Sequence, residues 1–265
     1  MKISLITTTF HSGATVTDTF ESVLSQTFKD IEYIVVDGAS TDNTIDIIKS
    51  YEPAFGGKMR WLSEKDSGVY DAMNKGLALV TGDVVGFLNS DDFFTENDCL
   101  QSVVDAFADS DIDAVYGNVH YVNADDLGTM VRFYSSKRFR PSLMRLGFMP
   151  AHPSFYCRRE IYSKYGVFDT SYKIASDFEL LLRFIYVHKI KTKYIAKDFV
   201  TMRTGGLSTS GLSSHNQIMK DHRKALKANK VYSNFFILCL RYIYKVYEVI
   251  KAHLTALIIS RSRCG

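Results

Sequence analysis

The sequence has few cysteines and no long apolar run, and both absences narrow its class. Its 265 residues include four cysteines, which lie far apart and form no Cys-x-x-Cys pair. This distribution argues against a zinc site or a disulfide scaffold and suits a reducing cytosol. No window holds the charge-free apolar run of a membrane-spanning helix, and the apolar run at the N-terminus is too short for a signal peptide. The chain also has no internal repeat and no low-complexity tract.

The length and the charge distribution predict one large domain with a basic extension. A chain of 265 residues is long enough for one α/β domain plus an extension, and 46% hydrophobic and 23% charged residues are ordinary for a globular protein. The net charge is +3, but residues 216–265 hold ten Lys and Arg against two Asp and Glu, which leaves −5 for residues 1–215. A basic end on an acidic body predicts an anionic partner surface there, either a membrane or a nucleic acid.

Expected strands and helices alternate through the first half of the chain. This alternation is typical of βαβ units and a parallel sheet, so we predict an α/β fold. Ser67 is the expected N-cap of the third helix. We expect strands over residues 2–8, 31–36, 58–62 and 83–88, helices over 15–26, 43–51 and 68–80, and a further helix that begins at Thr95.

The rhythm changes after residue 113. Residues 204–214, rich in Gly and Ser, are expected to form a mobile loop, and everything from residue 215 onward is expected to be helical. We expect strands over residues 114–122, 129–134, 154–157, 192–195 and 199–203, and helices over 159–165 and 177–188, with an irregular basic stretch at 135–150.

Two adjacent carboxylates, Asp91 and Asp92, directly follow a buried strand. The apolar run over residues 84–88 stops at Asn-Ser-Asp-Asp, and in open α/β sheets ligands bind at the carboxyl ends of strands. Adjacent carboxylates repel each other, and a cation that prefers oxygen ligands, such as Mg²⁺ or Mn²⁺, relieves the repulsion. The alternative is a solvated turn, because Asn, Ser and Asp are turn residues.

Asp37 ends the second expected strand. Its carboxylate is a candidate acceptor for a base N–H group or a ribose hydroxyl. The alternative is a structural cap on the turn that follows, and the residues alone leave both open.

The segment from Asp66 to Lys75 holds another group of charges. Asp71 and Lys75 are four residues apart on the expected helix, so they share one face. One interpretation is a surface ion pair worth about 0.3–0.5 kcal/mol. The other is that Lys75 or Asn74 meets a phosphate while Asp66 or Asp71 meets a ribose.

Ser176-Asp177-Phe178-Glu179 has the spacing of a capping box, with Ser176 as the N-cap. Asp177 then lies at the positive end of the helix dipole, which favours its ionised form. A carboxylate held rigidly at a helix start is a suitable general base. The alternative is that Asp177 only complements the dipole.

Four motifs in order resemble the signature of the family 2 glycosyltransferases. The first is Thr7-Thr8-Thr9-Phe10 together with Glu-Tyr-Ile-Val-Val-Asp-Gly-Ala-Ser-Thr-Asp-Asn-Thr over residues 32–44. Ser-Glu-Lys-Asp-Ser-Gly at 63–68, the Asn-Ser-Asp-Asp at 89–92 and Asp-Phe-Glu-Leu-Leu-Leu-Arg at 177–183 follow in the family's order. The resemblance covers residues 1 to about 205. It is closest to the branch that builds bacterial exopolysaccharides and O-antigens, such as the colanic acid transferases.

The resemblance implies a GT-A fold, a Rossmann-like mixed sheet flanked by helices, and inverting transfer from a nucleotide-sugar, expected to be a UDP-sugar. It also implies Mn²⁺ or Mg²⁺ as cofactor. We expect a catalytic domain over residues 1–214, with a nucleotide-binding half at 1–112 and an acceptor half at 113–214. A basic, amphipathic helical extension at 215–265 follows.

The resemblance also implies roles for individual residues. Thr8, Phe10 and Asp37 would contact the nucleoside, with Phe10 stacked on the base. Asp66 would lie at the base or ribose, with Asp71 beside it, and Lys75 near the diphosphate. Asp91 and Asp92 would hold the metal and the diphosphate, and Asp177 would be the catalytic base.

The sequence departs from the family pattern at two positions. Asn89 stands where the family often has Asp, which leaves open the choice of metal ligand among Asn89, Asp91 and Asp92. Ser176 stands where the family often has Glu before the base.

Two further residues have open roles. His152 lies between Pro150-Ala151 and Pro153, and it either packs in a rigid turn or reaches the diphosphate or acceptor. Arg203 precedes the Gly-Ser stretch, which is either a lid over the nucleotide or a solvated loop.

Residues 233–259 are mostly apolar and aromatic with sparse charges, and Arg241, Lys245 and Glu248 form one narrow polar face. This pattern predicts a helix in a membrane interface beside anionic lipids. The protein would then be cytoplasmic and peripheral on the inner face of a bacterial membrane, near a saccharide acceptor linked to polyprenyl diphosphate. The alternative is a helix packed on its own domain or on a second subunit of a homo-oligomer. No recognised nucleic-acid motif accompanies the basic end.

Two other classes share parts of this pattern. A sugar-1-phosphate nucleotidyltransferase has a similar architecture, but residues 7–13 lack the Gly-rich loop that its triphosphate site needs. A flavodoxin-like binding module has its acidic pocket after the first and third strands, and this chain is too long for one.

Overall fold

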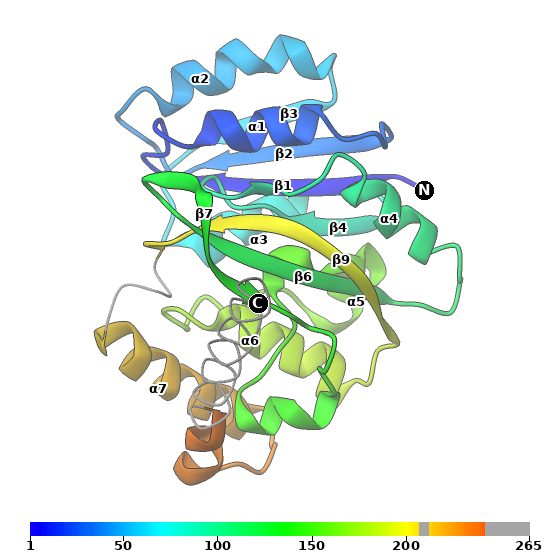
Figure 1. Cartoon of the computed structure of the whole chain (residues 1–265), viewed down its shortest axis with the longest axis vertical. Coiled ribbons are helices and arrows are strands. Elements are labelled where there is room, and N and C mark those ends of the chain that lie inside the picture. Colours follow the sequence, from blue (N-terminus) through cyan, green and yellow to red (C-terminus); the bar gives the residue numbers. More distant parts are fainter. Residues whose placement is uncertain (207–211, 242–265) are drawn as a thin grey trace, which may run out of the picture.

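The computed structural model of the chain describes residues 1–206 and 212–241, except for the side chains of residues 212 and 213. A nine-stranded mixed sheet runs through its centre, with helices on both faces (Figure 1). The strand order is β3-β2-β1-β4-β8-β6-β9-β5, and β7 pairs with β6. The strands are β1 Ile3–Thr9, β2 Ile31–Asp37, β3 Met59–Ser63, β4 Val84–Phe87, β5 Phe93–Phe94, β6 Ala114–Asn123, β7 Asp126–Tyr134, β8 Tyr156–Arg158 and β9 Thr192–Arg203.

The helices connect these strands in the alternation that the sequence predicts. The α-helices are α1 Val16–Leu24, α2 Thr44–Tyr51, α3 Val69–Leu79, α4 Cys99–Ala106, α5 Arg159–Tyr165, α6 Ser176–Leu181 and α7 Leu212–Ala228. Shorter helical turns are η1 Glu52–Phe55, η2 Pro141–Leu146, η3 His152–Ser154 and η4 Leu182–Val187. The prediction of an α/β fold with a mixed sheet flanked by helices is confirmed.

The first four strands in space are parallel and bring their carboxyl ends to one edge. Strand β1 pairs with β2 and β4, and β2 pairs with β3. The register aligns Thr9 with Asp37 and Asp37 with Ser63. The polar segments that follow these strands therefore gather at one edge of the sheet, as expected for an open α/β sheet.

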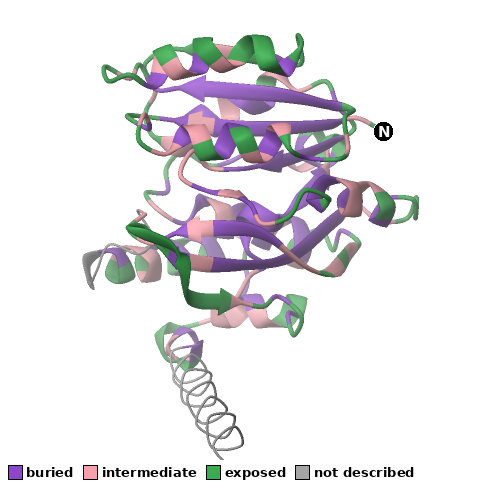
Figure 2. Cartoon of the chain, turned by 45° about the horizontal axis from the view of Figure 1, so that its top comes forward, coloured by how far each residue is buried: buried purple, intermediate pink, exposed green. Residues whose placement is uncertain are grey.

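The core lies on both faces of the sheet. One apolar cluster joins the sheet to α3, α5 and α6, and a second joins it to α1, α2 and α4. Figure 2 shows the strands as largely buried and the helices as exposed on their outer sides. Continuous apolar runs such as Ile34-Val35-Val36 are buried on both sides, which explains why they do not alternate with polar residues.

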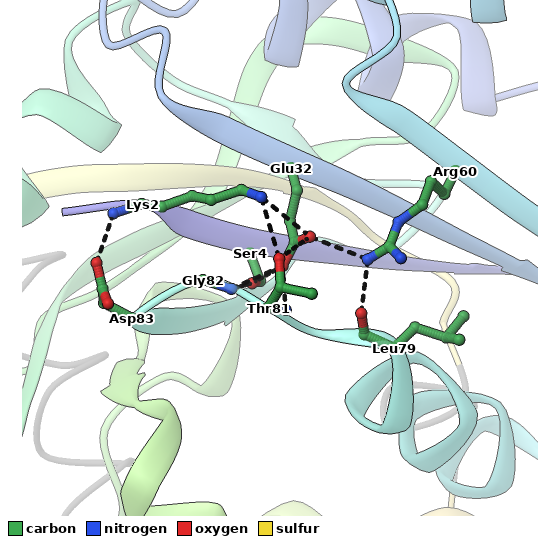
Figure 3. A network of polar contacts seen from close by, with 8 residues as sticks. All are labelled: Lys2, Ser4, Glu32, Arg60, Leu79, Thr81, Gly82 and Asp83. Carbon is green, nitrogen blue, oxygen red and sulfur yellow. Dashed lines mark hydrogen bonds and ion pairs between the residues drawn. The ribbon is translucent and has the colours of Figure 1, made fainter.

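A buried carboxylate, Glu32, ties the opposite edge of the sheet together (Figure 3). It accepts hydrogen bonds from Ser4 Oγ, from Thr81 Oγ1 at 2.7 Å and from the Gly82 N–H at 2.8 Å, and it pairs with Arg60 at 2.9 Å. Burial by itself raises the pKa of Glu32, but these hydrogen bonds outweigh burial and lower it to about 2. Glu32 therefore stays ionised and joins β1, β2 and the loop before β4.

The helix expected to begin at Thr95 begins four residues later. Residues 93–94 form β5, which pairs with β9, and the Thr95 N–H donates to Phe199 O at 3.0 Å. Pairing across the sheet therefore outweighs the local cap signal, and α4 starts at Cys99.

The two strands expected at 192–195 and 199–203 form one strand, β9. Lys197 and Asp198 interrupt the apolar pattern without ending the strand. Lys197 pairs with Glu96 at 2.7 Å, and Asp198 contacts His120 Nδ1 at 2.7 Å. Partners on neighbouring elements satisfy these charges within the sheet.

Both expected N-caps are wrong. Gly68, with φ of 117°, precedes α3 in place of Ser67, because the backbone there takes a conformation that favours glycine.

The N-terminus of α6 also differs from the expectation, because Ala175 precedes this helix and Ser176 is its first helical residue. The capping box is not formed, because Ser176 Oγ donates to Asp169 O at 2.8 Å and Glu179 pairs with Arg183. The expected helix over 177–188 also changes to a π-helical turn at Leu182.

The C-terminal part is helical but interrupted. Helix α7 begins at Leu212, inside the expected loop over 204–214, and residues 207–211 lie outside the described part. The chain leaves the helix over 229–234 and is helical again over 235–241, so the expectation of continuous helix from 215 is wrong. Leu238 joins the core cluster of α6, and Arg241 is buried. Arg241 is therefore not on an exposed polar face, and Lys245 and Glu248 lie outside the described residues.

None of the helices within residues 1–206 and 212–241 is long and apolar enough to cross a membrane.

Candidate active site

The two adjacent carboxylates form a tight turn after β4. The Asp92 N–H donates to Asn89 O at 3.1 Å, and Asn89 Nδ2 donates to Asp92 Oδ2 at 2.9 Å. Asp92 is buried and Asp91 is half-buried. Burial raises the pKa of both carboxyls, and the charge of Asp91 raises the pKa of Asp92 further. The turn therefore disfavours two ionised carboxylates side by side, and a bound cation would favour them.

Helix α1 and Arg203 hold this turn by its backbone. Thr15 Oγ1 donates to Ser90 O at 2.9 Å, and Thr19 Oγ1 donates to Asp92 O at 2.7 Å. Arg203, at the end of β9, donates to Asp91 O and pairs with Asp18 of α1. The guanidinium of Arg203 is thus buried against the turn, and its charge lowers the pKa of Asp91. The carboxylate oxygens of Asp91 stay clear of these backbone contacts.

The donor set of this turn fits a hard divalent cation. No cluster of three or more His, Cys, Asp or Glu side chains suited to a metal occurs among the described residues. Mg²⁺ sites are commonly built from one or two carboxylates plus substrate phosphates. Asp91 and Asp92 match this kind of site, in which the donor completes the coordination.

Phe10, Gly38 and Asp66 meet beside this turn. A Cβ on Gly38 would lie 2.5 Å from Asp66 Oδ2 and 3.2 Å from Phe10 Cδ2, so glycine is needed for this close approach. The Phe10 ring is 63% exposed and stacks on His11 at 4.2 Å. Thr8 is half-buried in β1, opposite Val36. An exposed ring next to a carboxylate is a surface on which a nucleoside base can stack and form hydrogen bonds.

Asp37 is surrounded by donors from its own chain. It accepts hydrogen bonds from Thr9 Oγ1 at 2.9 Å, Ser63 Oγ at 2.7 Å and the Ser40 N–H at 2.8 Å, and also from Ser40 Oγ. Burial raises the pKa of Asp37, but these bonds outweigh burial and lower it. Both oxygens accept hydrogen bonds from the chain itself, which is the arrangement expected of a structural cap.

The loops after β1 and β2 contain backbone strain. His11 and Ala39 have φ of 49° and 61°, in the left-handed region that non-glycine residues rarely adopt. The loops are joined because the His11 N–H donates to Ser40 Oγ at 2.9 Å. Strained residues cluster at functional sites, and these two flank Phe10 and Gly38. This strain leaves no signal in the local sequence.

Lys75 lies on the other side of Asp66, paired with acidic residues. Its Nζ is 2.9 Å from Glu64 Oε1 and 3.8 Å from Asp71 Oδ2. Asp71 also accepts a hydrogen bond from the Ser67 N–H at 3.0 Å. Asn74 binds the backbone of Phe168 through both ends of its amide, at 2.8 and 3.0 Å. In this arrangement Asn74 is structural, and Lys75 forms the ion pair that the sequence suggested, with Glu64 as its nearer partner.

Asp177 lies at the start of α6, half-buried. Burial raises its pKa to about 6, although hydrogen bonds from the Phe178 N–H at 2.8 Å and from Tyr70 Oη at 3.4 Å oppose this rise. The helix dipole was expected to favour the ionised form, but burial has the larger effect. A pKa near 6 suits a general base at neutral pH, because the group is ionised and still basic.

Tyr121 links Asp177 to the carboxylate pair. Burial raises the pKa of its phenol, the Arg132 cation lowers it, and the charges of Asp92 and Asp177 both raise it. Tyr121, in β6, therefore lies within electrostatic reach of both Asp92 and Asp177, which places these two acids in one region of the molecule.

Helix α7 supports the turn that carries Asp177. Asp221 of α7 is buried, and it accepts hydrogen bonds from the N–H groups of Ile174 at 2.9 Å and Ala175 at 3.2 Å. Tyr70 Oη donates to Ile174 O on the same turn. The sequence did not identify Tyr70, Tyr121 or Asp221 as site residues. Only Tyr70 lies in a segment that the sequence singled out, residues 66–75.

His152 is buried in η3, with its ring 5.3 Å from Phe87 and 5.6 Å from Phe168 between centroids. Its Nε2 has no hydrogen-bond partner within the described residues. Burial lowers the pKa of His152 to about 4, so the ring is neutral at pH 7. These contacts are those of a packed aromatic ring.

A family model described as "Glycosyl transferase family 2" matches residues 4–166. The chain belongs to this family. A Mycobacterium tuberculosis protein named "PGL/p-HBAD biosynthesis glycosyltransferase" is 29% identical over 216 residues, which cover 78% of this chain and 79% of that protein. An "uncharacterized glycosyltransferase" of the same species is 30% identical over 220 residues, 81% of this chain and 78% of its own length.

Two solved structures are similar in fold. Staphylococcus aureus TarS 1–349 in complex with UDP-GlcNAc has a TM-score of 0.69 and 20% identity, over 85% of this chain and 66% of that one. The mannosyltransferase PcManGT of Pyrobaculum calidifontis, in complex with GDP-Man and Mn²⁺, has a TM-score of 0.62 and 15% identity, over 96% and 82%. The protein is therefore a family 2 glycosyltransferase, and its fold is GT-A-like.

Proposed function

We propose that this family 2 glycosyltransferase inverts the anomeric centre as it moves a sugar from a UDP-sugar to a hydroxyl of a saccharide acceptor. The observation that carries the proposal is the proximity of two kinds of acid at Tyr121, because Asp92 of the carboxylate pair and Asp177, whose pKa is about 6, both raise the pKa of its phenol. The carboxylate pair can hold the leaving diphosphate, and Asp177 can accept a proton from the incoming hydroxyl.

On the donor side, Phe10 stacks on the base, and Asp66 accepts a hydrogen bond from the base or the ribose. Asp91 and Asp92 hold Mn²⁺ or Mg²⁺ together with the diphosphate. The cation, when bound, neutralises the charge that develops on the leaving diphosphate. Mn²⁺ in the PcManGT complex and UDP-GlcNAc in the TarS complex support these choices of metal and donor for this chain.

On the acceptor side, Asp177 removes the proton from the acceptor hydroxyl as that oxygen attacks the anomeric carbon. The attack comes from the face opposite the leaving group, so one displacement inverts the configuration. The turn held by Tyr70 and Asp221 keeps the Asp177 carboxylate fixed in position, so little reorganisation is needed in the transition state.

The acceptor that we propose is a lipid-linked saccharide of a bacterial cell-surface polysaccharide or glycolipid. The basic C-terminal part and the biosynthetic name of the mycobacterial relative support this class. We extend the proposal to a cytoplasmic protein bound peripherally to the membrane that carries such acceptors.

The proposal is tested by a binding screen of UDP- and GDP-sugars with and without Mn²⁺, followed by transfer assays. Asp92→Asn should lose metal-dependent donor binding because it removes a ligand charge. Asp177→Asn should keep donor binding and lose transfer. Asp125→Asn, an exposed carboxylate in the β6–β7 turn, is the matched control and should keep both. Metal-dependent donor binding that persists in Asp92→Asn would contradict the metal assignment.

A further inference from the structure

The outer face of α7 is strongly cationic. Lys220, Arg223, Lys224 and Lys227 follow one another at spacings of three, one and three residues, so they form one stripe along the helix, and all four are exposed. The acid of the same helix, Asp221, is buried on the opposite side against the Asp177 turn. The helix thus separates its charges, with the carboxylate inward and the cations outward.

Exposed aromatic residues continue this stripe. Tyr232 and Phe236 are 71% and 79% exposed, and Phe235 is also exposed. The Arg145 guanidinium lies 5.6 Å from the centre of the Tyr232 ring and adds a further cation. Surfaces that lie in a membrane interface are rich in aromatic side chains next to Lys and Arg.

A groove of about 670 Å³ runs between α7 and the helix over residues 235–241. Its described lining has an apolar floor and a cationic rim, with no carboxylate among its residues. The apolar and aromatic lining residues are Leu226, Val231, Tyr232, Phe235 and Leu238, and the cationic ones are Lys220, Arg223, Lys224, Lys227 and Lys230. Lys224 is partly used within the protein, because its Nζ donates to Ser171 O at 2.9 Å and lies over the Tyr172 ring.

We propose that the face formed by α7 and residues 230–236 docks on the surface of a bilayer that contains anionic lipids. The proposal rests on the proposed function, since it names the surface by which the enzyme would reach a lipid-linked acceptor. Charge complementarity selects this occupant, because the face is cationic and anionic headgroups carry the opposite charge. The chain's own residues 242–265 carry four Lys and Arg against one Glu, so their net charge has the same sign as the face.

Docking here has a geometric consequence for catalysis. The inner side of α7 contacts the Asp177 turn through Asp221, and His222 stacks on Phe178 at 3.8 Å. A helix is about 10 Å across, so the bilayer surface would lie roughly one helix diameter from the turn that carries the base. An acceptor anchored in the same membrane would then reach Asp177 from the α7 side of the molecule, which faces the bilayer.

The test is sedimentation of the full chain with vesicles of phosphatidylcholine alone and with about 30% phosphatidylglycerol. The wild type should bind the anionic vesicles, and high salt should weaken binding. The triple variant Lys220→Gln, Arg223→Gln, Lys227→Gln should bind about 100-fold more weakly, because each basic residue near an anionic surface contributes about fivefold. Phe235→Ser with Phe236→Ser should reduce the binding that remains in high salt.

The control removes the same charge at the far end of the molecule, where α2 lies opposite α7 (Figure 1). Lys29→Gln, Lys49→Gln, Lys58→Gln alters three exposed lysines and should bind like the wild type. Transfer to a water-soluble acceptor should be unchanged in both triple variants, which separates failure of docking from failure of the transferase. Equal vesicle binding by the two triple variants, or binding to a single-stranded RNA in place of vesicles, would overturn the proposal.

Discussion

Replacing Asp177 by Asn should abolish transfer and at the same time stabilise the protein. The folded state raises the pKa of Asp177 from 3.8 to about 6, so the ionised form is unfavourable there. One pKa unit corresponds to about 1.4 kcal/mol, which gives an upper limit of about 3 kcal/mol at neutral pH. Because Asp177 is only half-buried, solvent screening lowers the expected gain to about 1–2 kcal/mol.

The size of this effect changes with pH, while its sign stays the same. A carboxyl whose pKa rises on folding does not affect stability at a pH where it is protonated in both the folded and the unfolded state. Near pH 4 the loss of folding stability caused by Asp177 is therefore small, about 0.6 kcal/mol. It grows as pH rises through the window between 3.8 and about 6 and is constant above it. Asn keeps a side-chain oxygen for the Phe178 N–H and Tyr70 Oη, so the substitution removes mainly the charge.

The assay is urea unfolding of the wild type and Asp177→Asn from pH 4 to pH 8, beside a transfer assay at pH 7.5. The difference in unfolding free energy should favour the variant and widen as pH rises. Asp125→Asn should show no such widening, because Asp125 is exposed. A variant that is less stable than the wild type at pH 8, or a difference independent of pH, would refute the interpretation of Asp177 as a desolvated base.

Two further predictions concern buried acids. Glu32→Gln should lower the unfolding free energy by about 2–3 kcal/mol at pH 7, because the pKa of Glu32 falls from 4.5 to about 2 on folding. The difference in unfolding free energy between wild type and variant should shrink as pH falls from 4.5 toward 2. Equal urea midpoints at pH 7 would contradict this prediction. Asp221→Asn should move the acid limb of the kcat–pH profile to lower pH, because the Asp221 charge raises the pKa of Asp177. Asp221→Ala should also lower kcat, because it removes the hydrogen bonds that hold the turn before Asp177. An acid limb that stays in place in Asp221→Asn would show that Asp221 acts only on stability.

Local sequence was sufficient where one element decides its own structure. The apolar runs that become β1, β2 and β4, and the helical spacing of α1 and α5, were found within about two residues of their observed ends. Asp91 and Asp92 could be singled out because an apolar run ends just before them. The alternation of strands and helices then predicted that both acids lie at the carboxyl edge of the sheet.

Expectations failed where a partner outside the element decided the local structure. Thr95 looked like a helix start, but β9 captures residues 93–94 as a strand. Ser176 looked like a cap, but its hydroxyl binds Asp169. Hydrogen-bond partners some 100 residues away, such as Phe199 for Thr95, leave no local signal in the sequence.

The sequence by itself determined the α/β class and the family motifs, and it singled out Asp91, Asp92 and Asp177 as candidate acids, because strand period and motif spacing are properties of neighbouring residues. Only the tertiary structure decided that Asp37 is held by its own chain, that Tyr121 lies within reach of both Asp92 and Asp177, and that α7 turns its acid inward and its cations outward. Burial sets the pKa of Asp177, and burial arises only when segments far apart in the chain pack together.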